Sequence, residues 1–76
     1  MLEITKDVIT EVLSLKNSER DKITMDTSLK ENLGADSLDI VDITLELEDR
    51  IEVEIPDEVY KEFKTVGDIV NNLNSL

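Results

Sequence analysis

The chain contains neither cysteine nor histidine, so chemistry at a site must use its hydroxyl and carboxylate groups. Without thiols and imidazoles, zinc sites, thiol nucleophiles and serine triads lack their usual components. Ser37 has the most distinctive surroundings of the hydroxyls, in the sequence Leu-Gly-Ala-Asp-Ser-Leu. It follows Asp36, a residue type that caps helices, and precedes a long run with helical periodicity. We therefore expect Ser37 in the first turn of a helix.

That predicted position limits the chemistry of Ser37. A helix N-terminus carries unpaired N–H groups and partial positive charge, which favour a phosphate attached there. No histidine is available to take the serine proton, and the surrounding sequence is not the Gly-x-Ser-x-Gly turn of hydrolases. Position alone favours an ordinary first-turn serine. Any chemistry at Ser37 therefore requires modification by another protein.

The helix that begins at Asp36 is predicted over residues 36–50, and on a helical wheel residues 37–52 place their apolar side chains on two opposite stripes. One stripe comprises Ile40, Ile43, Leu47 and Ile51, and the other comprises Leu38, Val41 and Leu45. A surface helix of a small domain buries one stripe, so we expect the second stripe to stay partly exposed. Acids border the second stripe, with Asp39, Asp42, Glu46 and Asp49 on one side and Glu48 and Glu52 on the other. An apolar strip with an acidic border is typical of a docking surface for a basic partner.

The acidic charge is concentrated around this helix. The chain has 19 acids and 8 bases, a net charge of −11. Between Glu31 and Glu58 there are eleven acids and one base, Arg50, so this stretch alone carries −10. The alternative, that the acids are a solvated face and both stripes are core, leaves this concentration unexplained. Because a polyanion repels nucleic acids and anionic membranes, we expect neither a nucleic-acid partner nor membrane insertion.

The composition predicts a folded domain. Leu, Ile, Val and Phe make up 26 of the 76 residues, a larger share than disordered chains have. The length allows one small domain, residues 1–76, without a disulfide. Two glycines and one proline are too few for a fold of strands and turns. The first residues do not resemble a signal segment and no apolar run is long enough to span a membrane, so we expect a cytoplasmic location, or a domain without its targeting segment.

The apolar spacing predicts an all-α fold. We expect an amphipathic helix over residues 3–16, the helix over 36–50, a short helical turn over 57–62 and a last helix capped by Thr65. Residues 17–34 are predicted to form a long loop, held by Ile23, Met25, Leu29 and Leu33. The predicted fold class is a small four-helix bundle, with three principal helices and one short helix, and a long loop after the first helix.

The stretch from Gly34 to Asp39, the acidic helix and the sequence Glu-Ile-Pro-Asp-Glu at 54–58 together resemble acyl carrier proteins of dissociated (type II) fatty-acid synthesis. Asp-Ser-Leu is a weak motif alone and gains weight from this context. The resemblance implies that Ser37 carries 4′-phosphopantetheine, transferred from coenzyme A by a magnesium-dependent phosphopantetheinyl transferase. The thiol of this arm would hold growing acyl chains as thioesters. The resemblance further implies a monomeric carrier that is not itself an enzyme and has no metal site.

The same resemblance implies roles for further residues. Basic patches on fatty-acid synthesis enzymes would meet Asp36, Asp39, Asp42, Glu48 and Asp49, with Leu38, Val41 and Leu45 as apolar contacts. The acyl chain would lie among Leu29, Ile43, Leu47, Ile55, Tyr60, Phe63 and Ile69, which are core residues in any case. Three features depart from the family pattern: Tyr60 and Phe63 are large, Lys30 stands where an apolar residue is common, and Arg50 interrupts the acids.

The sequence is also compatible with other functions. Carriers of polyketide, nonribosomal-peptide and D-alanylation pathways share the serine, although the acidity and the length favour fatty-acid synthesis. From another class, an acidic protein that binds divalent cations is an alternative, but no segment fits an EF-hand loop. A nucleic-acid mimic that blocks a basic groove is also compatible with the charge. It leaves the Asp-Ser-Leu sequence and the second apolar stripe unexplained.

Overall fold

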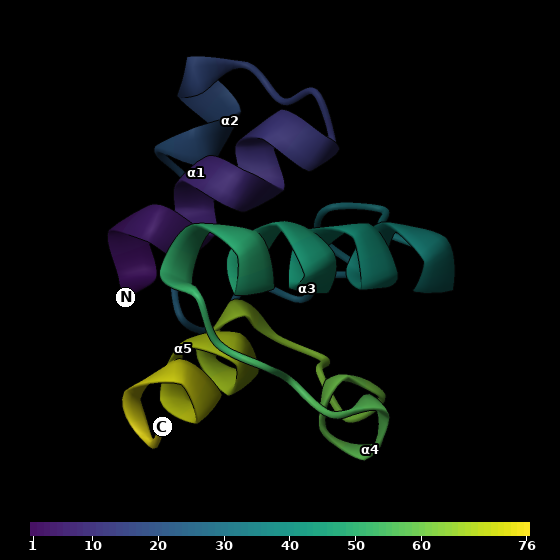
Figure 1. Cartoon of the computed structure of the whole chain (residues 1–76). Coiled ribbons are helices and arrows are strands. Elements are labelled where there is room, and N and C mark those ends of the chain that lie inside the picture. Colours follow the sequence, from purple (N-terminus) through teal and green to yellow (C-terminus); the bar gives the residue numbers. More distant parts are fainter.

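The first helix, α1, comprises Leu2–Val12 and packs against α2, α3 and α5 in the computed structural model, which describes all 76 residues (Figure 1). Val8 and Ile9 are fully buried on its inner face. The predicted helix over residues 3–16 is too long, because Ser14 adopts a left-handed φ of 55°. Leu13 and Leu15 still pack against the core although neither is helical, which explains why their spacing extended the prediction.

The predicted loop over residues 17–34 contains one additional element, the four-residue helix α2, Asn17–Arg20. The Arg20 guanidinium donates to the carboxylates of Asp7 (2.7 Å) and Glu3 (3.2 Å) on α1. These hydrogen bonds raise the pKa of Arg20 above its ordinary value. A single arginine therefore fastens α2 to α1.

The remainder of the loop is bonded to the segment that begins the last helix, in addition to being held by the buried side chains of Ile23 and Leu29. The backbone N–H of Leu29 donates to the carbonyl of Lys64 (2.9 Å), and the N–H of Gly67 donates to the carbonyl of Met25 (2.8 Å). A Cβ at residue 67 would lie 2.8 Å from that carbonyl oxygen, so this close approach requires glycine. Residues 25–29 and 64–67 are thus locked side by side.

The remaining helices agree with the predictions. The helix α3, Ser37–Ile51, ends where Glu52 adopts a left-handed φ of 58°. The short helix α4, Asp57–Tyr60, follows Pro56 and contacts α3. The last helix, α5, Val66–Asn74, is capped by Thr65, whose hydroxyl accepts the N–H of Asp68.

The architecture is the predicted all-α bundle, with three principal helices and no strand. The predicted count of four helices omits α2, so the bundle has two short helices instead of one. Figure 1 shows α3 lying across the molecule between α1 and α2 on one side and α4 and α5 on the other. The core between these helices includes the fully buried Leu29, Ile43, Leu47 and Ile69. No helix is long and apolar enough to cross a membrane.

Candidate functional site

A tight turn before α3 positions Ser37. Gly34 has a φ of 71°, which places it in the left-handed region that favours glycine. The N–H groups of Gly34 and Ala35 donate to the carbonyls of Lys30 (3.0 Å) and Leu29 (2.9 Å), which folds the chain back on itself. Ala35 is buried after this turn, whereas Ser37 lies at the surface as the first residue of α3.

The predicted cap of α3 is present. The carboxylate of Asp36 accepts the N–H of Asp39 (2.9 Å), and the carboxylate of Asp39 accepts the N–H of Asp36 (3.1 Å). The N–H groups of Ser37 and Leu38 have no acceptor within the chain, and the Ser37 hydroxyl makes no hydrogen bond. The site therefore offers an accessible hydroxyl beside two free donors at the positive end of a 15-residue helix. This arrangement fits an attached phosphate group.

The two apolar stripes of α3 differ in exposure as the periodicity predicts. Ile43 and Leu47 are fully buried, whereas Leu38 and Leu45 are 72% and 56% exposed. Val41, the third member of the outer stripe, is half-buried. The outer face of α3 thus presents two large apolar side chains to solvent.

The acids of α3 divide into two groups. Asp42 and Asp49 are exposed and have no partner in the chain. Glu48 is half-buried, and its carboxylate accepts the backbone N–H of Ile55 (2.7 Å). Glu48 therefore has a role inside the chain, as the capping carboxylates of Asp36 and Asp39 do. The Asp36 cap was predicted, whereas sequence reasoning missed the role of Glu48.

Arg50 faces α1 and not the outer stripe. Its guanidinium donates to Glu46 on α3 (2.9 Å) and to Glu11 on α1, and these hydrogen bonds raise its pKa above the ordinary value. Arg50 therefore neutralises charge between α1 and α3, and the exposed acids Asp42 and Asp49 keep their charge unpaired.

The residues predicted to surround an acyl chain come together in the core. Leu29, Ile43, Leu47 and Ile69 are fully buried, Ile55 and Phe63 are 5% exposed, and Tyr60 is half-buried at the edge. A hollow of about 280 Å³ is lined by two members of this set, Leu29 and Phe63, and not by the other five. Its lining comprises Ser28, Leu29, Lys30, Glu31, Ile40, Phe63 and Lys64. The predicted set omitted Ile40, although its place on the inner stripe of α3 was a usable signal.

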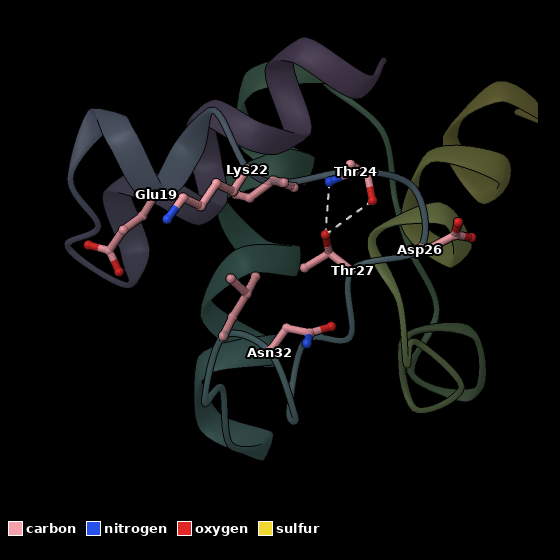
Figure 2. Close-up of a pocket in the computed structure, with 8 residues that line it drawn as sticks. Glu19, Lys22, Thr24, Asp26, Thr27 and Asn32 are labelled. Carbon is pink, nitrogen blue, oxygen red and sulfur yellow. Dashed lines mark hydrogen bonds between the residues drawn. The ribbon is translucent and has the colours of Figure 1, made fainter.

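Another hollow, of about 520 Å³, lies elsewhere, in the segment from α2 to the turn before α3. Figure 2 shows its polar lining, in which the hydroxyl of Thr27 accepts the N–H of Thr24 (2.8 Å). The lining contains two acids, Glu19 and Asp26, and one base, Lys22. It contains none of the predicted site residues. The acids of the chain also form no group of three or more suited to hold a metal ion.

Comparison with known proteins finds matches over nearly the whole chain. The family model of the phosphopantetheine attachment site matches residues 4–73. A structure of a candidate acyl carrier protein from Mycobacterium tuberculosis is 28% identical, with a TM-score of 0.87 over 97% of this chain and 95% of that chain. The solution structure of a candidate acyl carrier protein from Anaplasma phagocytophilum is 30% identical, with a TM-score of 0.83 over 97% of this chain and 84% of that chain.

Proposed function

Since the chain belongs to the phosphopantetheine-attachment family and is an acyl carrier protein by fold and sequence, we propose that Ser37 is its attachment residue. Domains of this family are the site of covalent 4′-phosphopantetheine attachment. The observation that carries the proposal is the exposed, unbonded hydroxyl of Ser37 beside the free N–H groups of Ser37 and Leu38. The arm supplies a thiol, which a chain without cysteine lacks.

Attachment at Ser37 forms a bond between its Oγ and the pantetheine phosphorus of coenzyme A. The phosphoanhydride bond breaks, and adenosine 3′,5′-bisphosphate leaves. The proton of the Ser37 hydroxyl passes to a base on the transferase, because this chain has no histidine and no bonded base at Ser37. The free N–H groups of Ser37 and Leu38 would stabilise the negative charge of the attached phosphate. The carrier therefore positions the group and leaves catalysis to its partners.

The cargo that we propose is a growing fatty-acyl chain, held as a thioester and presented to the enzymes of fatty-acid synthesis. The charge of −10 between Glu31 and Glu58 supports this pathway over polyketide, nonribosomal-peptide and D-alanyl carriers. Basic patches on the enzymes would meet Asp42 and Asp49, with Leu38 and Leu45 as apolar anchors. Such contacts are individually weak, so docking is fast, transient and sensitive to salt.

The attachment site is tested by intact mass after incubation with coenzyme A, magnesium and a broad-specificity phosphopantetheinyl transferase. We expect the mass to increase by one phosphopantetheine group in the wild-type protein and in Ser18→Ala, which alters an exposed serine of α2. The Ser37→Ala variant should show no increase. An unmodified wild-type protein, or a Ser37→Ala variant that is still modified, would contradict the proposal.

The pathway is tested with the modified protein. A ketoacyl synthase of fatty-acid synthesis should elongate its acyl thioester faster than the equivalent synthase of a polyketide pathway does. The reverse order of rates would favour a specialised pathway and contradict the assignment to fatty-acid synthesis.

A further inference from the structure

The hollow of about 280 Å³ opens beside the proposed attachment site. Its apolar lining comes from Leu29, Ile40 and Phe63. Ile40 lies one helical turn after Ser37 on α3. The carbonyl of Lys30 accepts the N–H of Gly34, so the other wall adjoins the turn that leads into Ser37. A group carried on Ser37 is therefore attached close to this hollow.

Two lysines lie on the edge of the hollow. Lys30 and Lys64 are both exposed, and both line it. The backbone hydrogen bond from Leu29 to Lys64 (2.9 Å) holds the two segments together. Because lysine stems pack on apolar surface while the ammonium groups stay in water, this lining combines an apolar interior with a cationic rim.

The charge of this rim is opposite to that of the rest of the surface around α3. Neither Lys30 nor Lys64 belongs to any ion pair of a chain that has 19 acids. Glu31 is the one acid in the lining. Asp68 also lies near Lys64: one oxygen of its carboxylate accepts the backbone N–H groups of Thr65 and Lys64, and the charge of Lys64 contributes to the lowered pKa of Asp68. Neither ammonium group is held in an ion pair, so both can turn toward an anion at the rim.

We propose that Lys30 and Lys64 let this hollow hold acyl chains that end in a carboxylate more firmly than uncharged chains of the same length. This inference rests on the proposed attachment at Ser37. The methylene groups of the cargo would occupy the hollow against Leu29, Ile40 and Phe63, while its carboxylate stays at the rim between the ammonium groups. An uncharged chain of equal length gains the apolar contacts but not the ionic ones.

The test compares two cargoes of equal size, adipoyl and its neutral terminal amide, adipamoyl. Each is loaded on Ser37 from its coenzyme A thioester, and its loss to hydroxylamine is followed by intact mass. The rates are normalised to those of the same free coenzyme A thioesters. In the wild-type protein at low salt, we expect adipoyl to be protected about two- to fivefold more than adipamoyl, the range of one exposed ion pair. Higher salt should reduce this difference.

Matched variants locate the effect. The double variant Lys30→Gln/Lys64→Gln should remove the difference between the cargoes, whereas Lys30→Arg/Lys64→Arg should retain it. Lys61→Gln removes an exposed lysine that does not line the hollow, and it should change nothing. Glu31→Gln should increase the selectivity. Amide chemical shifts of Ile40 and Phe63 should move more with adipoyl than with the unloaded arm.

Three results would overturn this inference and leave the proposed function intact. They are equal protection of the two cargoes, loss of selectivity in Lys61→Gln, and amide chemical shift changes at Lys30 and Lys64 that are already complete with the unloaded arm. The last would assign the lysines to the phosphodiester of the arm. Failure of any loading at Ser37 would overturn the proposed function and this inference with it.

Discussion

The two faces of α3 use the same aliphatic residue types for opposite purposes. Ile43 and Leu47 on the inner face are fully buried, whereas Leu38 and Leu45 on the outer face are 72% and 56% exposed. Burial of such a side chain stabilises a fold by about 1.5–3 kcal/mol, a gain that the outer leucines largely lack. Apolar residues at helical spacing therefore indicate a contact surface, and the contact can be with the core of the same chain or with a partner.

The largest expected effect is on the inner face. Leu47→Ala should lower the free energy of unfolding by about 2–5 kcal/mol, because it leaves a cavity in the core. This is a large part of the roughly 4–11 kcal/mol expected for 76 residues. Leu45→Ala should change it by less than about 0.5 kcal/mol. Urea denaturation of the two variants measures both values, and equal losses would contradict the assignment of the two faces.

The outer face should matter for partner enzymes instead. Leu38→Ala and Leu45→Ala should each lower kcat/KM with a fatty-acid synthesis enzyme by about five- to tenfold, as expected for apolar anchors of an interface. Leu76→Ala is the control, because Leu76 is 64% exposed but far along the chain from α3. Circular dichroism should show unchanged helicity in all three variants. Unchanged kinetics in both α3 variants would remove the docking proposal.

The acids sharpen the comparison, because two of them on one helix should respond differently. Glu48→Ala leaves the N–H of the buried Ile55 without its acceptor and should destabilise the protein by about 1 kcal/mol. Asp42→Ala removes an exposed, unpaired charge and should change stability by less than about 0.5 kcal/mol. In partner assays, Asp42→Ala should reduce the salt dependence of kcat/KM. A larger loss of stability in Asp42→Ala than in Glu48→Ala would contradict this division.

The smallest expected effect concerns a carboxylate outside α3. Hydrogen bonds from the N–H groups of Thr65 and Lys64 hold the pKa of Asp68 below its ordinary value of 3.8. A depressed pKa in the folded state means that the stabilisation is present above pH 3.8 and is lost as the pH falls through the folded value. Asp68→Asn should therefore be less stable at pH 7, by under about 1 kcal/mol at this exposed site.

Urea midpoints of Asp68→Asn and the wild-type protein, measured from pH 7 down to pH 2, check this expectation. The two curves should converge in acid, where the wild-type carboxyl is also neutral. A difference that stays constant across this range would mean that the charge of Asp68 has no part in capping α5.

Local signals in the sequence were sufficient for much of this molecule. The caps Asp36 and Thr65 act on residues three positions away, so the sequence alone predicts them correctly. The same holds for the two faces of α3, which depend only on helical spacing. The fold class followed from these elements, and the position of Ser37 at a helix start followed from its cap.

Features that depend on the path of the chain in space were not predictable. The helix α2 has four residues, too few for a periodic pattern. The bond from Ile55 to Glu48 forms because the chain reverses after Glu52. The first predicted helix was too long because Leu13 and Leu15 are apolar. Their apolar character indicates that they pack against the core, and it does not indicate that they are helical.

Residues 25–29 are hydrogen-bonded to residues 64–67, and this pairing makes one wall of the 280 Å³ hollow more rigid than the other. A bulky cargo should therefore displace the less rigid wall. At Leu29 and Lys64 the wall is held by backbone hydrogen bonds between two separate segments. The backbone N–H groups of residues 57–63 bond only to carbonyls three or four residues earlier in the chain. The side chain of Phe63 packs in the core, but the backbone hydrogen bonds that tie this segment to the rest of the chain lie only at its ends, from Ile55 to Glu48 and at Lys64. Local opening should therefore be more frequent in α4 than in residues 25–29, and the bonded amide hydrogens of α4 should exchange faster than those of Leu29 and Gly67.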